Sequence, residues 1–135
     1  MSTARPVNIE ISSTVDNQTT KHSVQGDLYE KPNATFVRYK EPEPSLGRTF
    51  TVLKWSPSEL KVIRQGEAPT NMTFVLNEWT SGYYDTAVGR LNLRIFTTKL
   101  ELPPLRGSNR ELLWSYRIYV DSELSGQFDI KVTFF

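Results

Sequence analysis

Few residues of this chain could carry out catalysis or hold a metal ion. The sequence has no cysteine, and His22 is its only histidine. A Ser-His-Asp triad would have to use that one imidazole, and one chain cannot form a two-histidine metal site. Among the 15 Asp and Glu residues, no spacing singles out a pair for acid–base chemistry. We therefore expect no enzyme activity, no metal site and no cofactor, and we interpret His22 as an ordinary strand residue.

A more specific signal comes from polar residues that share the phase of apolar neighbours. They are Tyr39 and Glu41, which follow Val37; Arg64, which follows Leu60 and Val62; and Thr97, which follows Leu91, Leu93 and Ile95. On straight strands these side chains would point into the protein. An interior charge costs several kcal/mol unless it is paired or reaches water. Arg64 therefore needs a carboxylate, a wet cavity or an anionic ligand.

Glu41 is the internal candidate to pair with Arg64. Neighbouring strands lie about 4.8 Å apart, so the two side chains could meet across an intervening strand only if both are extended. The alternative is that both lie at strand ends, beside Pro42 and Gly66, and reach solvent. Tyr84 and Thr86 offer hydroxyls that could bind the same polar end of a ligand. The candidate ligand-binding residues are Tyr39, Glu41, Arg64, Tyr84, Thr86 and Thr97.

Strands must position these residues, and alternation of apolar and polar side chains predicts them along the whole chain. The clearest example is the run Phe128, Ile130, Val132 and Phe134, which alternates with mostly polar neighbours. The expected strands cover about 7–15, 19–29, 34–40, 48–55, 60–65, 72–76, 83–86, 91–97, 110–120 and 125–134. A tight turn is expected at Asp16-Asn17, a bulge or bend at Gly26, and irregular loops at 41–47 and 102–109.

The segment Ser56-Pro57-Ser58-Glu59 allows two interpretations. Serine, proline and a glutamate three residues after the serine form the signature of a helix start. However, Leu60, Val62 and Arg64 alternate with Lys61 and Ile63, and Gly66 follows too soon for a stable helix. We favour a hairpin turn between two strands.

About eight to ten short strands separated by turns are typical of a β-sandwich or a β-barrel. A barrel is favoured because closure removes the exposed edge strands. The predicted fold class is therefore all-β, an antiparallel meander β-barrel. At 135 residues the chain fits a single domain, with an ordered core at about 7–134.

Composition narrows the classes of partner. With 16 Lys and Arg residues the formal net charge is +1, so no global field attracts nucleic acid, and we consider that partner disfavoured. No apolar stretch resembles a signal peptide or a membrane-spanning helix, so we expect neither export nor a membrane partner. Zero cysteines fit a reducing compartment, and we expect a cytoplasmic protein.

The 16 aromatic residues could form a stacking surface for nucleic acid, as they do in OB-folds. Most of them instead alternate in phase with aliphatic residues. Phe74 shares its phase with Met72, Trp114 shares its phase with Ile118, and Phe128 does so with Ile130. We interpret the aromatics mainly as core.

The same residues carry a resemblance to a known family. The motifs are Gly26-x-Leu28-Tyr29, Val37-x-Tyr39-x-Glu41, Arg64-x-Gly66, Met72-x-Phe74, Tyr84-x-Thr86-x-x-Gly89-x-Leu91-x-Leu93 and Thr97. In order and spacing, over about residues 7–134, they resemble the YwiB-like family of uncharacterised bacterial proteins. The resemblance implies a calycin-type barrel, similar to lipocalins, and a bacterial cytoplasmic origin. It implies no activity. The chain departs from the family in its two Pro-rich loops.

From architecture we expect a non-enzymatic barrel that holds a small apolar or amphipathic ligand, with a polar or anionic end near Arg64. A barrel of about eight strands is either filled by side chains or holds one small ligand. The alternative is an interaction module with a filled interior that binds a protein, or less readily nucleic acid, through its surface. The sequence does not indicate an oligomeric state.

Overall fold

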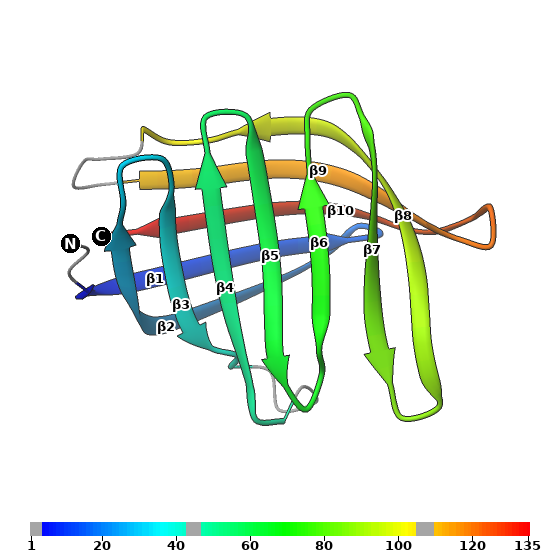
Figure 1. The fold of residues 1–135 in the computed structure, drawn as a ribbon, viewed down its shortest axis with the longest axis horizontal. Helices are drawn as coiled ribbons and strands as arrows, with labels where there is room; N and C mark the ends of the chain where they lie inside the picture. The colour runs from blue at the N-terminus through cyan, green and yellow to red at the C-terminus, as the bar shows by residue number, and fades with distance from the viewer. Residues whose placement is uncertain (1–3, 43–46, 105–109) are drawn as a thin grey trace.

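A computed structural model describes residues 4–42, 47–104 and 110–135. These residues form ten antiparallel strands that close into one barrel, and each strand pairs with its neighbours in the chain (Figure 1). The strands are β1 (Ala4–Val15), β2 (Gln18–Glu30), β3 (Thr35–Lys40), β4 (Thr49–Ser56), β5 (Glu59–Gly66), β6 (Thr70–Phe74), β7 (Trp79–Thr86), β8 (Gly89–Glu101), β9 (Arg110–Val120) and β10 (Glu123–Phe134). The predicted antiparallel meander barrel is confirmed. None of the described segments is a helix long and apolar enough to cross a membrane.

Two tight turns join β1 to β2 and β9 to β10. Asp16 and Asn17 have φ angles of 48° and 72°, and Asp121 and Ser122 have φ angles of 51° and 67°. Positive φ at both central residues defines the turn whose twist matches the twist of paired strands, and Asn and Asp tolerate it best among residues with a side chain. The predicted Asp16-Asn17 turn is confirmed.

The ambiguous segment around Pro57 forms a hairpin and not a helix. β4 ends at Ser56, β5 begins at Glu59, and Trp55 pairs with Leu60 across the turn. Both of these side chains are completely buried. The burial they gain by facing the same interior outweighs the local preference for a helix start.

Several local predictions were wrong or lie outside the described residues. Of the bulge or bend predicted at Gly26, the bulge is absent, because β1 and β2 pair without a break in register; a Cβ there would lie 2.5 Å from the carbonyl oxygen of Arg38. The register shifts instead between Thr97 and Lys99 and between Leu124 and Gly126. β7 and β8 are longer than expected. Of the two predicted loops, residues 43–46 and 105–109 lie outside the described residues.

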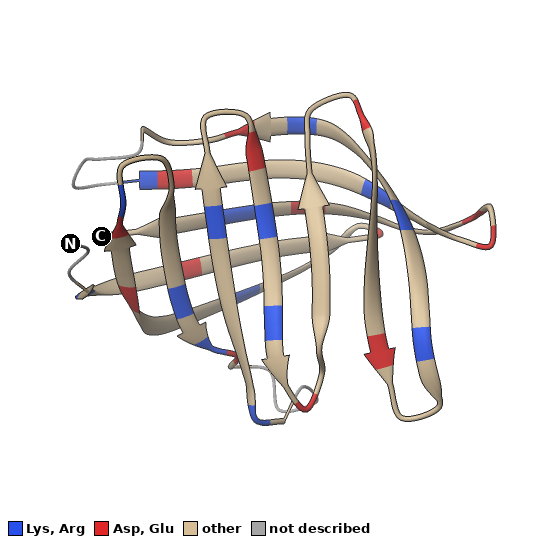
Figure 2. Ribbon diagram, in the orientation of Figure 1, with Lys and Arg blue, Asp and Glu red and all other residues tan. Residues whose placement is uncertain are grey.

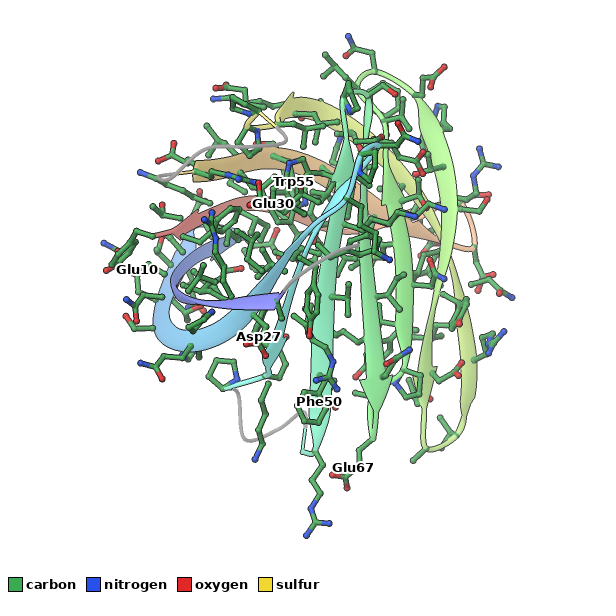
Figure 3. All side chains as sticks on the ribbon, turned by 60° about the vertical axis from the view of Figure 1, so that its left-hand side comes forward. Glu10, Asp27, Glu30, Phe50, Trp55 and Glu67 are labelled. Atoms are coloured by element: carbon green, nitrogen blue, oxygen red, sulfur yellow. The ribbon has the colours of Figure 1, made fainter. Side chains whose placement is uncertain are left out.

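The interior is filled with apolar side chains at the end of the barrel that holds the β4–β5 hairpin. Trp55 packs against Phe134 with tilted rings and 5.3 Å between ring centroids, and Phe74 packs against Trp114 with 5.9 Å between centroids. Trp55 lies at this end of the β4–β5 pair, whereas Glu67 lies at the opposite end (Figure 3). The expectation that aromatics form the core holds for these four residues.

Removal of the last strand should unfold the protein. β10 pairs with both β9 and β1, and Val132 and Phe134 are buried. Each fully buried side chain of this kind contributes roughly 1.5–3 kcal/mol, against a total stability of about 5–15 kcal/mol for a domain. A chain ending at Gly126 should show no cooperative thermal transition by circular dichroism. A transition near the parent temperature would contradict this role of β10.

Candidate functional site

A cavity of about 200 Å³ lies inside the barrel, next to the filled end. Its apolar wall combines side chains from five strands: Leu53, Val62, Met72, Trp114, Ile130 and Val132. Each of these residues occupies an inward position of its strand, so the alternation that builds the core also builds this wall.

The other part of the cavity lining is polar. It includes Ser13, Thr20, His22, Tyr39, Glu41 and Arg64. Thr20 is exposed, and most of the others are half-buried, which places the polar lining toward the opening and the apolar wall in the interior. A molecule in this cavity would therefore meet hydrogen-bonding groups at one end and apolar groups at the other.

Arg64 and Glu41 form an ion pair across the strand between them. Arg64 Nε lies 3.6 Å from Glu41 Oε2, and the Thr51 hydroxyl on the intervening β4 donates a hydrogen bond to the same carboxylate oxygen. The Glu41 side chain is 9% exposed and that of Arg64 is 26% exposed. The predicted pairing over one strand is present. Both residues lie near strand ends, as the alternative interpretation expected, but the Glu41 side chain is largely buried and does not reach freely into solvent.

Two buried phenols border this ion pair. Burial raises the pKa of the Tyr39 hydroxyl; the Glu41 charge raises it further, while Arg64 and a hydrogen bond with Thr51 oppose the shift. Burial also raises the pKa of Tyr116 to about 12, against the opposing charge of Arg64. Both hydroxyls therefore keep their protons at neutral pH and act as hydrogen-bond donors in the cavity.

The other predicted site residues do not line this cavity. Tyr84 is partly buried and pairs with Thr70, which in turn pairs with Arg64. The Thr86 hydroxyl donates a 2.7 Å hydrogen bond to the carbonyl oxygen of Gly89 in the β7–β8 turn. Thr97 is fully buried opposite Tyr116 in the register of β8 and β9. The structure thus groups Tyr39, Glu41 and Arg64 and leaves Tyr84, Thr86 and Thr97 apart from them.

Sequence reasoning missed three residues in or beside the cavity: His22 and Trp114 line it, and Thr51 lies beside it as the hydrogen-bond partner of Glu41. His22 lines the cavity and lies in the same phase of its strand as Val24 and Leu28. The alternation that predicted an inward Arg64 would therefore also have placed the His22 side chain inward. Thr51 and Trp114 were likewise in phase with buried neighbours. Trp114 was assigned to the core, and its position between core and cavity became visible only in the closed barrel.

The described residues also form hollows on the outer surface of the barrel. A hollow of about 370 Å³ lies over β1, β2 and β10, where it is lined by Glu10, Lys21 and Lys131 among others. These side chains occupy outward positions, so the hollow is a surface groove and not a barrel cavity. Among the described residues, no group of three or more His, Asp and Glu side chains could hold a metal ion.

Comparisons with known proteins identify a family model, a curated relative and a solved structure that this chain is similar to. Residues 7–132 match the model of a family described as a domain of unknown function, DUF1934. The chain is 24% identical over 133 residues to the uncharacterised β-barrel protein YwiB of Bacillus subtilis (strain 168), covering 96% of this chain and 92% of that protein. The crystal structure of the B. subtilis YwiB protein superposes with a TM-score of 0.84 at 22% identity, covering 97% of this chain and 91% of that one. The resemblance seen in the sequence is confirmed.

Substitution of Arg64 by Met should destabilise the protein by about 1–3 kcal/mol, because it leaves the nearly buried Glu41 carboxylate without its cation. The double variant with Glu41→Gln should recover much of that loss, since residues in contact couple. Urea unfolding of the two single variants and the double variant measures the coupling. Additive losses would show that the pair contributes nothing to stability.

Tyr116→Phe should change the stability of the protein at alkaline pH. The folded-state pKa of about 12 lies above the ordinary value of 10.0, so the unfolded state loses the proton first and stability falls as the pH rises from about 10 to 12. At about 1.4 kcal/mol per pKa unit, the loss is about 2–3 kcal/mol. Unfolding free energies across this range should fall less steeply in Tyr116→Phe than in the parent. Equal slopes would contradict the assignment.

Proposed function

This chain belongs to the DUF1934 family, a domain of unknown function, and from that premise we propose that its barrel binds a small amphipathic molecule without catalysing a reaction on it. The observation that carries the proposal is the two-part cavity, with Arg64 and Glu41 toward its opening and an apolar wall beyond them. Ligand sites are typically concave and mostly apolar, with a few polar groups that orient the ligand.

The size of the cavity limits the ligand. An apolar cavity of about 150 Å³ accepts a benzene molecule, and this one measures about 200 Å³. Trp55, Phe74 and Phe134 fill the interior beyond it, so a long acyl chain finds no room there. The proposed ligand is therefore about the size of one substituted ring and smaller than a typical lipid.

The polar groups of the cavity favour binding over catalysis. The one carboxylate that lines the described cavity, Glu41, accepts a hydrogen bond from Thr51 and is paired with Arg64, so it already has two partners within the protein. Within the described part of the cavity no second carboxylate accompanies it, so we propose a binding role.

A second candidate function is an interaction module that binds a protein through its outer face. Trp79 is 50% exposed and packs against Phe96 and Tyr119, with centroids at 5.2 and 5.1 Å, while Arg94 lies over its ring at 5.3 Å. Exposed Trp, Tyr and Arg residues are enriched in protein interfaces. Positive and negative residues are interspersed along the strands (Figure 2), which gives no comparable support to a nucleic-acid partner.

Native mass spectrometry of the protein purified under mild conditions tests the leading proposal. We expect an additional mass of a small molecule that is lost on denaturation. A Val62→Phe variant fills the cavity from its apolar wall and should lose that mass, because the new ring occupies the ligand volume. Val52→Phe is the matched control, since Val52 faces outward from the neighbouring strand β4.

Two results would contradict the leading proposal. One is a bare protein mass that stays unchanged when small aromatic and aliphatic compounds are added. The other is a bound mass that survives Val62→Phe but is lost in Trp79→Ala, which would favour the outer face.

A further inference from the structure

We infer that the ligand of this cavity is a single-ring carboxylate with a second hydrogen-bond acceptor on the ring, held between Arg64 and Trp114. The inference rests on the proposed function and names the chemical class of its ligand. It depends on two side chains that line the same cavity and that each carry a buried donor atom with no acceptor among the described residues, namely Arg64 Nε and Trp114 Nε1.

Arg64 has more donors than its protein partner uses. A guanidinium carries five N–H donors, whereas the 3.6 Å separation between Arg64 Nε and Glu41 Oε2 is an ion pair and too long for a hydrogen bond. The Glu41 carboxylate in turn accepts hydrogen bonds from Thr51 and Tyr39. Arg64 can therefore bind a second carboxylate, and guanidinium groups match carboxylates in geometry as well as charge.

Trp114 supplies the second anchor. Its side chain is only 3% exposed and lines the cavity, yet its indole N–H has no acceptor among the described residues. Buried N–H groups are almost always hydrogen-bonded in native proteins. A ligand that brings an acceptor to this atom would satisfy it, and a ligand without one would leave it unpaired.

The shape of the cavity favours a ring as the body of this ligand. The volume of about 200 Å³ fits one substituted ring. Aromatic side chains from two strands, Tyr39 and Trp114, face the cavity and can pack on a flat ligand. Tyr116 adds a third ring and a protonated hydroxyl close to Arg64. A flexible chain would gain less from these surfaces and lose more conformational entropy on binding.

The barrel also contains a natural control. Trp55 is fully buried and its Nε1 likewise has no acceptor among the described residues, but it packs against Phe134 in the filled end and does not line the cavity. Ligand binding should therefore change the surroundings of the Trp114 indole N–H and leave those of the Trp55 indole N–H nearly unchanged.

The test compares probes that differ at one atom. Benzoate and the pyridine-3- and pyridine-4-carboxylates have the same shape, but only the pyridines carry a ring acceptor; nicotinamide replaces the carboxylate by a neutral amide, and decanoate replaces the ring by a chain. Each probe is titrated against ¹⁵N-labelled protein, and the indole N–H resonances are assigned with Trp114→Phe and Trp55→Phe. We expect one of the pyridine carboxylates to bind about three- to tenfold more tightly than benzoate, the range of one hydrogen bond.

Variants of Trp114, Trp55 and Arg64 show which side chains bind the probes. Trp114→Phe should abolish the advantage of the pyridine carboxylate and leave benzoate binding in place, whereas Trp55→Phe should retain the advantage. Arg64→Met should weaken both acids about ten- to a hundredfold, as expected for a hydrogen-bonded charge, and should bring the affinity of the pyridine-3-carboxylate down to that of nicotinamide. The fold of each variant is checked by measuring its thermal unfolding transition.

Three results would overturn the inference: benzoate that equals both pyridine carboxylates, nicotinamide that equals the acids in the parent protein, or decanoate that binds more tightly than every ring. In the first two cases a probe still occupies the cavity and the proposed function stands, whereas tighter binding of decanoate would also contradict the ring-sized ligand of the proposed function. If no probe shifts the Trp114 resonance and native mass spectrometry finds no bound molecule, the proposed function fails together with the inference.

Discussion

The pairing of β1 with β10 is the interaction on which the rest of the structure depends. Every other pair joins strands that follow one another in the chain, while this pair joins the first strand to the last, with Ile9 opposite Phe134 and Val15 opposite Phe128. Closure removes the exposed edges of the sheet. It also determines which side chains are enclosed, because a shift by one residue in this register would turn every inward side chain of β10 outward.

Closure forces polar residues into contact near one end of the barrel. Inward positions alternate on all strands, so Tyr39, Thr51 and Arg64 meet inside the wall with Glu41 next to them. Each would be costly alone in an apolar interior. Together they share hydrogen bonds and an ion pair, and the half-exposed position of Arg64 leaves its charge partly hydrated. The cavity exists where this polar group replaces the tight aromatic packing of the other end.

The comparison with the B. subtilis YwiB structure shows how little sequence identity this architecture requires. A TM-score of 0.84 accompanies only 22% identity. Such tolerance is expected when a fold depends on the alternation of apolar and polar residues and on turn residues, because many side chains satisfy the same pattern. The residues in and around the cavity are under different constraints, since there a donor or a charge must find a specific partner.

The sequence by itself determined the local features of this protein. The alternation of apolar and polar residues predicted the strands, and the residue types Asp16 and Asn17 predicted the turn that they form. The shared phase of Arg64 and Val62 predicted an inward charge. Each of these features depends only on neighbours in the chain. Only the tertiary structure decided which inward residues meet. Glu41 reaches Arg64 and Thr86 does not, because Thr86 Oγ1 serves the β7–β8 turn. Trp114 borders a cavity whereas Trp55 fills the core, because closure places them against different opposite walls. Distances between strands far apart in the chain depend on closure and register, which no local pattern contains.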